Sequence, residues 1–180
     1  MSLPNLFKPR FLAVFASIMI SISLTGCFRP MLAERSDGSS VTTDLSQIYI
    51  GTIGGRVGQR VRNDLIYAFG TTSGGAGALY QLSISLNVSD KNTLILPNTR
   101  VRGKTTLLKA TYTLTDSATG EVVHGGTAHS RASYDSSTAF FANERAEIDA
   151  ENRAAGILAE DIKTRVSAWI AANQHTGPNT

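Results

Sequence analysis

The sequence contains few of the residues on which many secreted domains and enzymes depend. One cysteine in 180 residues excludes an intrachain disulfide. Aromatic residues make up 7% of the chain and include one tryptophan, so there is no base-stacking signature of a nucleic-acid binder. The apolar run Phe11–Leu24 has 14 residues, whereas a membrane-spanning helix needs about 20. The fold therefore depends on packing without a disulfide, and the short apolar run is better explained as a targeting segment than as a membrane span.

The stretch Leu24-Thr25-Gly26-Cys27 follows that apolar run and has the pattern of a bacterial lipobox. Lys8 and Arg10 precede the run without an acidic residue, as in a signal peptide. We therefore predict that residues 1–26 are a lipoprotein signal peptide and that Cys27 is lipidated. A chance cysteine after a signal sequence and a single-span anchor are the alternatives. Because Phe28 rather than aspartate follows Cys27, the expected location is the periplasmic face of the outer membrane.

The charge balance argues against a general polyanion binder. With Lys8 and Arg10 removed from the 17 basic residues, 15 basic and 14 acidic residues remain. The remaining length corresponds to one domain. The predicted organisation is a tether over 27–43, a single α+β domain over 44–172 and a flexible tail over 173–180.

Hydrophobic periodicity predicts two helices and four strands. Val57, Val61, Leu65 and Phe69 form one apolar stripe, which predicts a helix over 56–69. The glycine-rich stretch from Gly70 is expected to stop this helix. Strict alternation of apolar and polar residues predicts a strand at 80–89 and recurs at 100–116. The β-branched and aromatic residues at 45–53 predict a first strand. A loop is expected at 90–98 and a turn at 116–120, after which 121–133 is the hairpin partner of 100–116, with a bulge at Gly125–Gly126.

The last element is predicted to be a long helix that begins near Ser137 or Thr138. Its apolar seam comprises Phe141, Ile148, Ala155, Leu158, Ile162, Val166 and Trp169 or Ile170. Two amphipathic helices need one face of a sheet to cover. We therefore expect a two-layer sandwich of two helices on a four-stranded mixed sheet, in the order β-α-β-β-β-α.

No residue pattern indicates catalysis, a metal or a cofactor. His124 and His129 share a strand but differ in parity, and His175 lies in the tail, so a common metal site is not expected. Glu147 and Glu151 are placed on an exposed helical face. The glycine-rich stretch 70–77 lacks the lysine and helix of a phosphate loop and is interpreted as a connector.

One local basic cluster is a candidate binding site. Arg100, Arg102 and Lys104 alternate at the start of a predicted strand, with Lys91 in the preceding loop. The spacing predicts a ledge of cations about 13 Å long, beside the apolar residues Leu94-Ile95-Leu96. Such a ledge suits a phosphorylated amphiphile. A solvated strand end is the alternative.

Four stretches of the chain together carry a resemblance to a known family. They are Cys27–Leu32, Arg56–Leu65, Tyr112–Asp116 with Thr119-Gly120, and Ser133–Asp135 leading into 140–155. On these segments the chain resembles the LPS-assembly lipoprotein family LptE in its alphaproteobacterial form. The resemblance covers nearly all of the chain after Gly26, and the order and spacing of the segments carry it more than any one of them.

The resemblance implies a two-layer sandwich that acts as a plug and not as an enzyme. Such proteins sit inside an outer-membrane β-barrel, LptD, assist its assembly, and help deliver lipopolysaccharide to the outer leaflet, with lipopolysaccharide itself as the expected ligand. No catalytic residues are implied. Two alternatives stay open: an auxiliary lipoprotein of an ABC-type lipid transporter, and a pilotin that escorts a secretin.

Overall fold

The computed structural model describes residues 41–71, 75, 77–95, 101–137 and 139–173. The predicted signal peptide, Cys27 and most of the predicted tail lie outside these residues. The described elements, in chain order, are α2 (Val41–Ser46), β1 (Ile48–Ile50), α3 (Gly55–Phe69), β2 (Tyr80–Ile95), β3 (Val101–Asp116), β4 (Val122–Asp135) and α4 (Phe140–Asn173).

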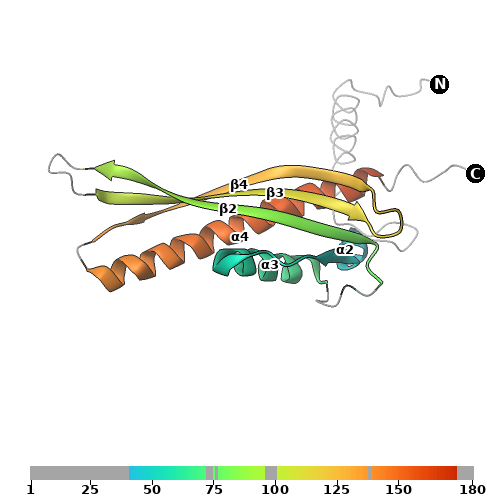
Figure 1. Cartoon of the computed structure of the whole chain (residues 1–180), viewed down its shortest axis with the longest axis horizontal. Coiled ribbons are helices and arrows are strands. Elements are labelled where there is room, and N and C mark those ends of the chain that lie inside the picture. Colours follow the sequence, from blue (N-terminus) through green and yellow to red (C-terminus); the bar gives the residue numbers. More distant parts are fainter. Residues whose placement is uncertain (1–40, 72–74, 76, 96–100, 138, 174–180) are drawn as a thin grey trace, which may run out of the picture. The chain divides into compact units, whose positions relative to one another are not determined.

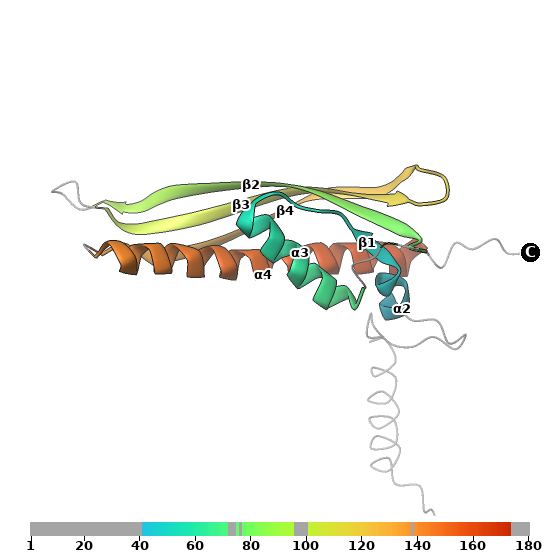
Figure 2. The ribbon, with the colours of Figure 1, turned by 60° about the horizontal axis from the view of Figure 1, so that its bottom comes forward.

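The four strands form one mixed sheet in the order β1-β2-β3-β4. The short strand β1 is parallel to β2, and β3 is antiparallel to both β2 and β4. Both α3 and α4 lie on the same side of this sheet (Figures 1 and 2). The predicted class, a two-layer α+β sandwich on a mixed sheet, is confirmed.

The helix α3 forms where the apolar stripe predicts it. Its stripe residues Val57, Val61, Leu65 and Phe69 are all buried. Gly70 ends the helix in the left-handed conformation, with φ of 66°, and its N–H reaches carbonyls of the last turn. Arg62, off the stripe, donates from Nε to the carbonyls at the end of β1, at 3.2 Å. The glycine-rich stretch therefore begins as a helix stop.

The three long strands alternate between a buried and an open face. Their even-numbered residues face the helices, and the most buried apolar ones are Leu82, Leu108, Ala110, Tyr112, Leu114, Ala128 and Ala132. The predicted turn between β3 and β4 is confirmed: Asp116 Oδ1 accepts hydrogen bonds from two following amides, and Gly120 has a positive φ of 73°. We call the surface away from the helices the outer face.

The apolar seam of α4 is buried only in part. From Ala150 to Ile170 its apolar side chains pack against the sheet and α3. Phe141, predicted to start the seam, is 79% exposed, and Ile148 is half-buried. That part of the prediction is wrong, because periodicity sets which residues share a stripe but does not provide a partner for the whole stripe.

The first predicted strand exists, but its predicted bounds of 45–53 are wrong. Residues 41–46 form α2, which buries Val41 and Leu45, and β1 is limited to three residues. Val41 and Leu45 are four residues apart, a helical spacing that places both against the core. The β-branched residues after Leu45 form a stronger strand pattern than this helical spacing, so the sequence did not predict α2.

Residues 90–95 continue β2 and do not form the predicted loop. Asp90 lies opposite Thr106, whose hydroxyl donates to Asp90 Oδ1 at 2.7 Å. Cross-strand hydrogen bonds of this kind allow a polar segment to remain in a strand. The pairing becomes irregular only between Asn92 and Ile95.

The irregularity in β4 lies at Val122–His124, and not at Gly125–Gly126 as predicted. The glycines have a packing role. A Cβ at Gly126 would lie 2.9 Å from Tyr112 Oη, so a larger residue would collide with the tyrosine ring.

Candidate functional site: a groove and an outer face at the distal end of the sheet

The end of the sheet farthest from β1 is less covered than the rest. We call this part, residues 87–95, 101–109 and 129–135 with the first turns of α4, the distal end. Here Val88 is 40% exposed and Phe140 is 74% exposed. In Figure 2 the hairpin of β2 and β3 extends over the N-terminal half of α4, well beyond α3. These two apolar side chains are therefore available for contacts outside the core.

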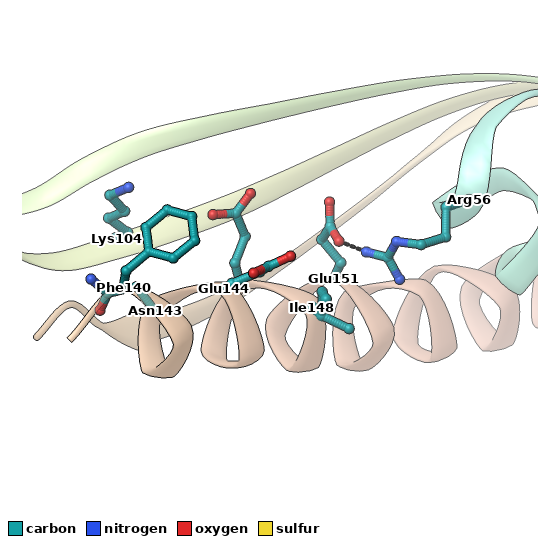
Figure 3. A pocket seen from close by; sticks show the side chains of 8 residues that line it. Arg56, Lys104, Phe140, Asn143, Glu144, Ile148 and Glu151 are labelled. Atoms are coloured by element: carbon teal, nitrogen blue, oxygen red, sulfur yellow. Dashed lines mark ion pairs between the residues drawn. The ribbon is translucent and has the colours of Figure 1, made fainter.

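A groove of about 690 Å³ lies between the sheet and α4 at this end. Its lining comes from three elements and consists of Arg56, Lys104, Phe140, Asn143, Glu144, Glu147, Ile148 and Glu151. Figure 3 shows Glu144 and Glu151 rising from α4 toward the sheet, with Lys104 and Arg56 approaching from β3 and α3. We refer to this feature as the acidic groove.

Two carboxylates of the acidic groove, those of Glu147 and Glu151, interact with neighbouring side chains. The spacing of Glu144, Glu147 and Glu151 by three and four residues puts them on one face of α4. Arg56 forms an ion pair with Glu151. Tyr134 Oη donates to Glu147 Oε2 at 3.2 Å. The expectation that Glu147 and Glu151 lie on an exposed face is therefore wrong, because both line this groove.

Tyr134 connects the groove to the core. Its side chain is 8% exposed. Burial, reinforced by the negative charge of Glu147, raises the pKa of Tyr134 to about 12. The phenol is thus neutral at ordinary pH and acts as a fixed hydrogen-bond donor to the carboxylate.

The structure divides the predicted basic ledge. Arg100 lies outside the described residues, and Arg102 is described only in its backbone, within β3. Lys104 faces α4 and lines the acidic groove. Lys91 pairs in register with Thr105, so its side chain lies on the outer face. Lys91 and Lys104 therefore do not form one surface.

The outer face carries cations without intervening acids. Its odd-numbered positions are mainly serine, threonine, asparagine and glutamine. Lys109 pairs with His129, and Arg131 lies two residues further along β4. All three are exposed, as is Lys91. In the described strands no carboxylate occurs at these positions between Gln81 and Ser133. We call Lys91, Lys109, His129 and Arg131 the outer-face cluster.

The sequence analysis missed the outer-face cluster, although strand alternation could have indicated it. Lys109 alternates with Leu108 and Ala110, so strand periodicity alone places it on the face opposite these apolar residues, whereas the predicted ledge consists of basic residues with the parity of the core. Arg131 also borders a shallow depression with Arg60, Arg153 and the exposed Ile157. Positive charge therefore continues around the edge of β4.

The histidines lie on opposite faces, as their parity predicts. His124 stacks on Trp169 with ring centroids 5.7 Å apart, and its Nε2 lies 3.4 Å from Tyr112 Oη. Burial lowers the pKa of His124. His129 is exposed on the outer face. Among the described residues there is no group of three metal-ligating side chains.

In the described part of the chain, no helix has both the length and the apolar character required to cross a bilayer. The long helix α4 carries charged residues throughout, including the ion pairs Arg153–Asp149 and Arg165–Asp161.

Comparisons with known proteins identify the fold and the family. A solved structure of a candidate lipoprotein from Caulobacter crescentus CB15 is 26% identical and has a TM-score of 0.62; the match covers 73% of this chain and 96% of that one. Rare lipoprotein B from Shewanella oneidensis is 10% identical, with a TM-score of 0.56, and the match covers 71% and 98% of the two chains.

A third solved structure, an uncharacterized lipoprotein B from Nitrosomonas europaea, is 15% identical with a TM-score of 0.54; the match covers 74% of this chain and 90% of that one. At this identity the last two show the fold alone. No curated protein matches the chain. The model of the family described as LptE, Lipopolysaccharide-assembly, matches residues 45–166. The match spans more than half of the chain, which therefore belongs to the LptE lipopolysaccharide-assembly family of lipoproteins.

Proposed function

We propose that this protein is an outer-membrane lipoprotein, anchored through Cys27, that assembles with an LptD-type β-barrel and contacts lipopolysaccharide during its transport. The observation that carries the proposal is the family match over residues 45–166. The lipobox Leu24–Cys27 and its preceding signal pattern support the anchor. The role requires binding and positioning, and no catalytic residue is assigned.

The outer-face cluster is the better candidate for contacts with lipid phosphates. Lys91, Lys109 and Arg131 are exposed and have no carboxylate beside them on that face. Lys104, in contrast, faces Glu144, Glu147 and Glu151 across the acidic groove. A phosphate approaching Lys104 would meet these negative charges, whereas one approaching the outer face would not. Arg100 and Arg102 remain separate candidates for lipid contact, proposed from the sequence alone.

The lipid contact is tested with the full-length chain in detergent and purified lipopolysaccharide. Replacing Lys91, Lys109 and Arg131 with glutamine should weaken binding about tenfold, because exposed charge contacts contribute about 0.2–1 kcal/mol each and 1.4 kcal/mol is tenfold. Lys104→Gln is the matched control and should have little effect. Equal losses in both variants would contradict the outer-face assignment.

The partner is tested by gentle extraction of outer membranes and purification through a C-terminal tag. Recovery of a large β-barrel protein in near-equimolar amount, with mislocalised lipopolysaccharide on depletion, is the expected result. Recovery with inner-membrane ATPase and permease subunits would instead support an auxiliary lipoprotein of a lipid transporter.

A further inference from the structure

The strand β2 has an edge that is open along most of its length. Its outer neighbour β1 pairs only with Tyr80, Gln81 and Leu82. The last hydrogen bond of this pairing runs from Gly51 N to the Leu82 carbonyl, at 3.0 Å. Among the described residues, no strand pairs with this edge of β2 beyond that point. This edge of β2 therefore has the backbone geometry of a strand but, among the described residues, no neighbouring strand to pair with.

The register identifies which backbone groups face outward. Since the Leu82 carbonyl points toward β1, the N–H and C=O of every second residue after it point the same way. Those residues include Leu86, Val88, Asp90 and Asn92, and the pairing with β3 stays in register up to Asn92. An unpaired strand edge of this kind is a template for another strand.

The opposite edge of the sheet, on β4, differs in two ways. The Arg153 guanidinium donates to the Ser133 carbonyl at 3.0 Å and so occupies an outward-facing acceptor. The helix α4 packs along β4 and β3, whereas its contact with β2 is slight. Figure 2 shows the distal half of β2 extending past α3. Of the two edges, that of β2 is the more accessible to an added strand.

The side chains beside the open edge define the chemistry of a partner. Leu86 and Val88 present apolar surface on the helix-facing side, and Val88 is 40% exposed. Asp90 follows on the same side, and its negative charge acts on Tyr134 together with that of Glu147, one of the three glutamates of the acidic groove. Arg56 and Lys104 offset only part of this negative charge. A strand laid along β2 would extend alternate side chains over this surface.

We propose that the edge of β2 from Leu86 to Asn92 receives an extended segment of a partner polypeptide, with basic side chains at alternate positions over the acidic groove. Main-chain hydrogen bonds would provide affinity, and the alternate side chains would provide selectivity. This inference rests on the proposed function only in that the protein has a polypeptide partner, and it is independent of lipid binding.

A synthetic ten-residue peptide of alternating lysine and valine tests the edge directly. It is titrated into the full-length chain in detergent. Val88→Pro removes an outward N–H and leaves the pairing with β3 intact, so it should weaken binding at least tenfold. Thr127→Pro makes the same change on the open edge of β4 and should leave binding unchanged. A peptide with glutamate in place of lysine should bind at least tenfold more weakly.

Amide hydrogen exchange on the wild-type chain provides a measurement that does not depend on a substitution. The amides of Leu86, Val88, Asp90 and Asn92 should exchange quickly in the free chain and become protected with the peptide. The amides along the outer edge of β4 should not change. Absence of protection, or equal losses with both proline variants, would overturn the inference.

Three outcomes separate this inference from self-association and from the proposed function. A wild-type dimer that Val88→Pro converts to a monomer would make a second copy the occupant and overturn the assignment to a basic partner segment. Co-purification with a β-barrel while these four amides stay unprotected would leave the proposed function standing and refute the edge. If no barrel is recovered but the peptide protects the edge, the proposed function fails and the inference stands.

Discussion

The two ends of the sheet show how the same alternating pattern leads to different surfaces. At the end near β1, even-numbered residues such as Leu82 and Leu114 are fully buried under α3 and α4. At the distal end, Val88 continues the same alternation on β2 but is 40% exposed. The two ends differ in what packs against the sheet, because α3 does not extend to the distal end. Apolar periodicity therefore marks a surface that can be buried, and only packing decides whether it is.

The largest expected contrast between the two ends is in stability. Leu65→Ala, in the fully buried stripe of α3, should lower the free energy of unfolding by about 2–5 kcal/mol. Phe141→Ala, at the 79% exposed start of α4, should change it by no more than about 0.5 kcal/mol. Chemical denaturation followed by circular dichroism measures both. A comparable loss of stability in Phe141→Ala would mean that the start of α4 is packed as tightly as the core.

Two helical glycines sharpen the contrast within the covered region. A Cβ at Gly58 would lie 2.7 Å from Ile53 Cγ2 and 3.0 Å from the Ile53 carbonyl, so Gly58→Ala should destabilise by about 1–3 kcal/mol. Gly156 has only Asp64 Oδ2 nearby, at 4.0 Å. Gly156→Ala should therefore stabilise by about 0.5–1 kcal/mol through helix propensity. Thermal unfolding of the two variants should shift in opposite directions, and shifts of the same sign would refute the close approach at Gly58.

Two buried serines provide a smaller test of the same packing. Ser130 Oγ donates to the Ala154 carbonyl at 2.7 Å and joins β4 to α4. Ser167 Oγ is buried without a hydrogen-bond partner among the described residues. Ser130→Ala should cost about 1 kcal/mol, whereas Ser167→Ala should be neutral or slightly stabilising. Denaturant midpoints measured side by side distinguish the two, and the reverse order would contradict the assigned hydrogen bond.

The smallest expected effect is a pH dependence from His124. Burial against Tyr112 and Trp169 lowers its pKa below the usual 6.5, so the folded state favours the neutral ring. Its contribution to stability is therefore present above pH 6.5 and is lost as the pH falls through 6.5 toward the lowered pKa. His124→Gln should flatten the pH dependence of stability in this window. Nuclear magnetic resonance titration of the His124 ring checks the direction of the shift, and a pKa at or above the usual value would contradict it.

Much of the fold followed from local patterns. The stripe of α3 and its glycine stop, the alternation of the long strands and the turn at Asp116–Gly120 were all predicted correctly. The errors share a cause. The segment at 45–53 and the loop at 90–98 were assigned from local residue type, while α2 and the end of β2 depend on contacts with distant residues such as Thr106.

The candidate site was less predictable than the fold. Lys104 has the parity of the core face, but which charges oppose it depends on where α4 begins and how it crosses the sheet. The three glutamates of the acidic groove are about forty residues away in sequence. The outer-face cluster combines residues of three strands and follows from register, which the strand patterns alone left unspecified.

By itself, the sequence determined the targeting signal pattern, the family resemblance, and the type and order of the main elements, because each depends on spacing along the chain. The tertiary structure decided which part of each apolar stripe is buried, which face of the sheet carries uncompensated cations, and which strand edge stays open. These properties depend on the pairing register and on the length of sheet that α3 covers, and both are set by contacts between residues far apart in the chain.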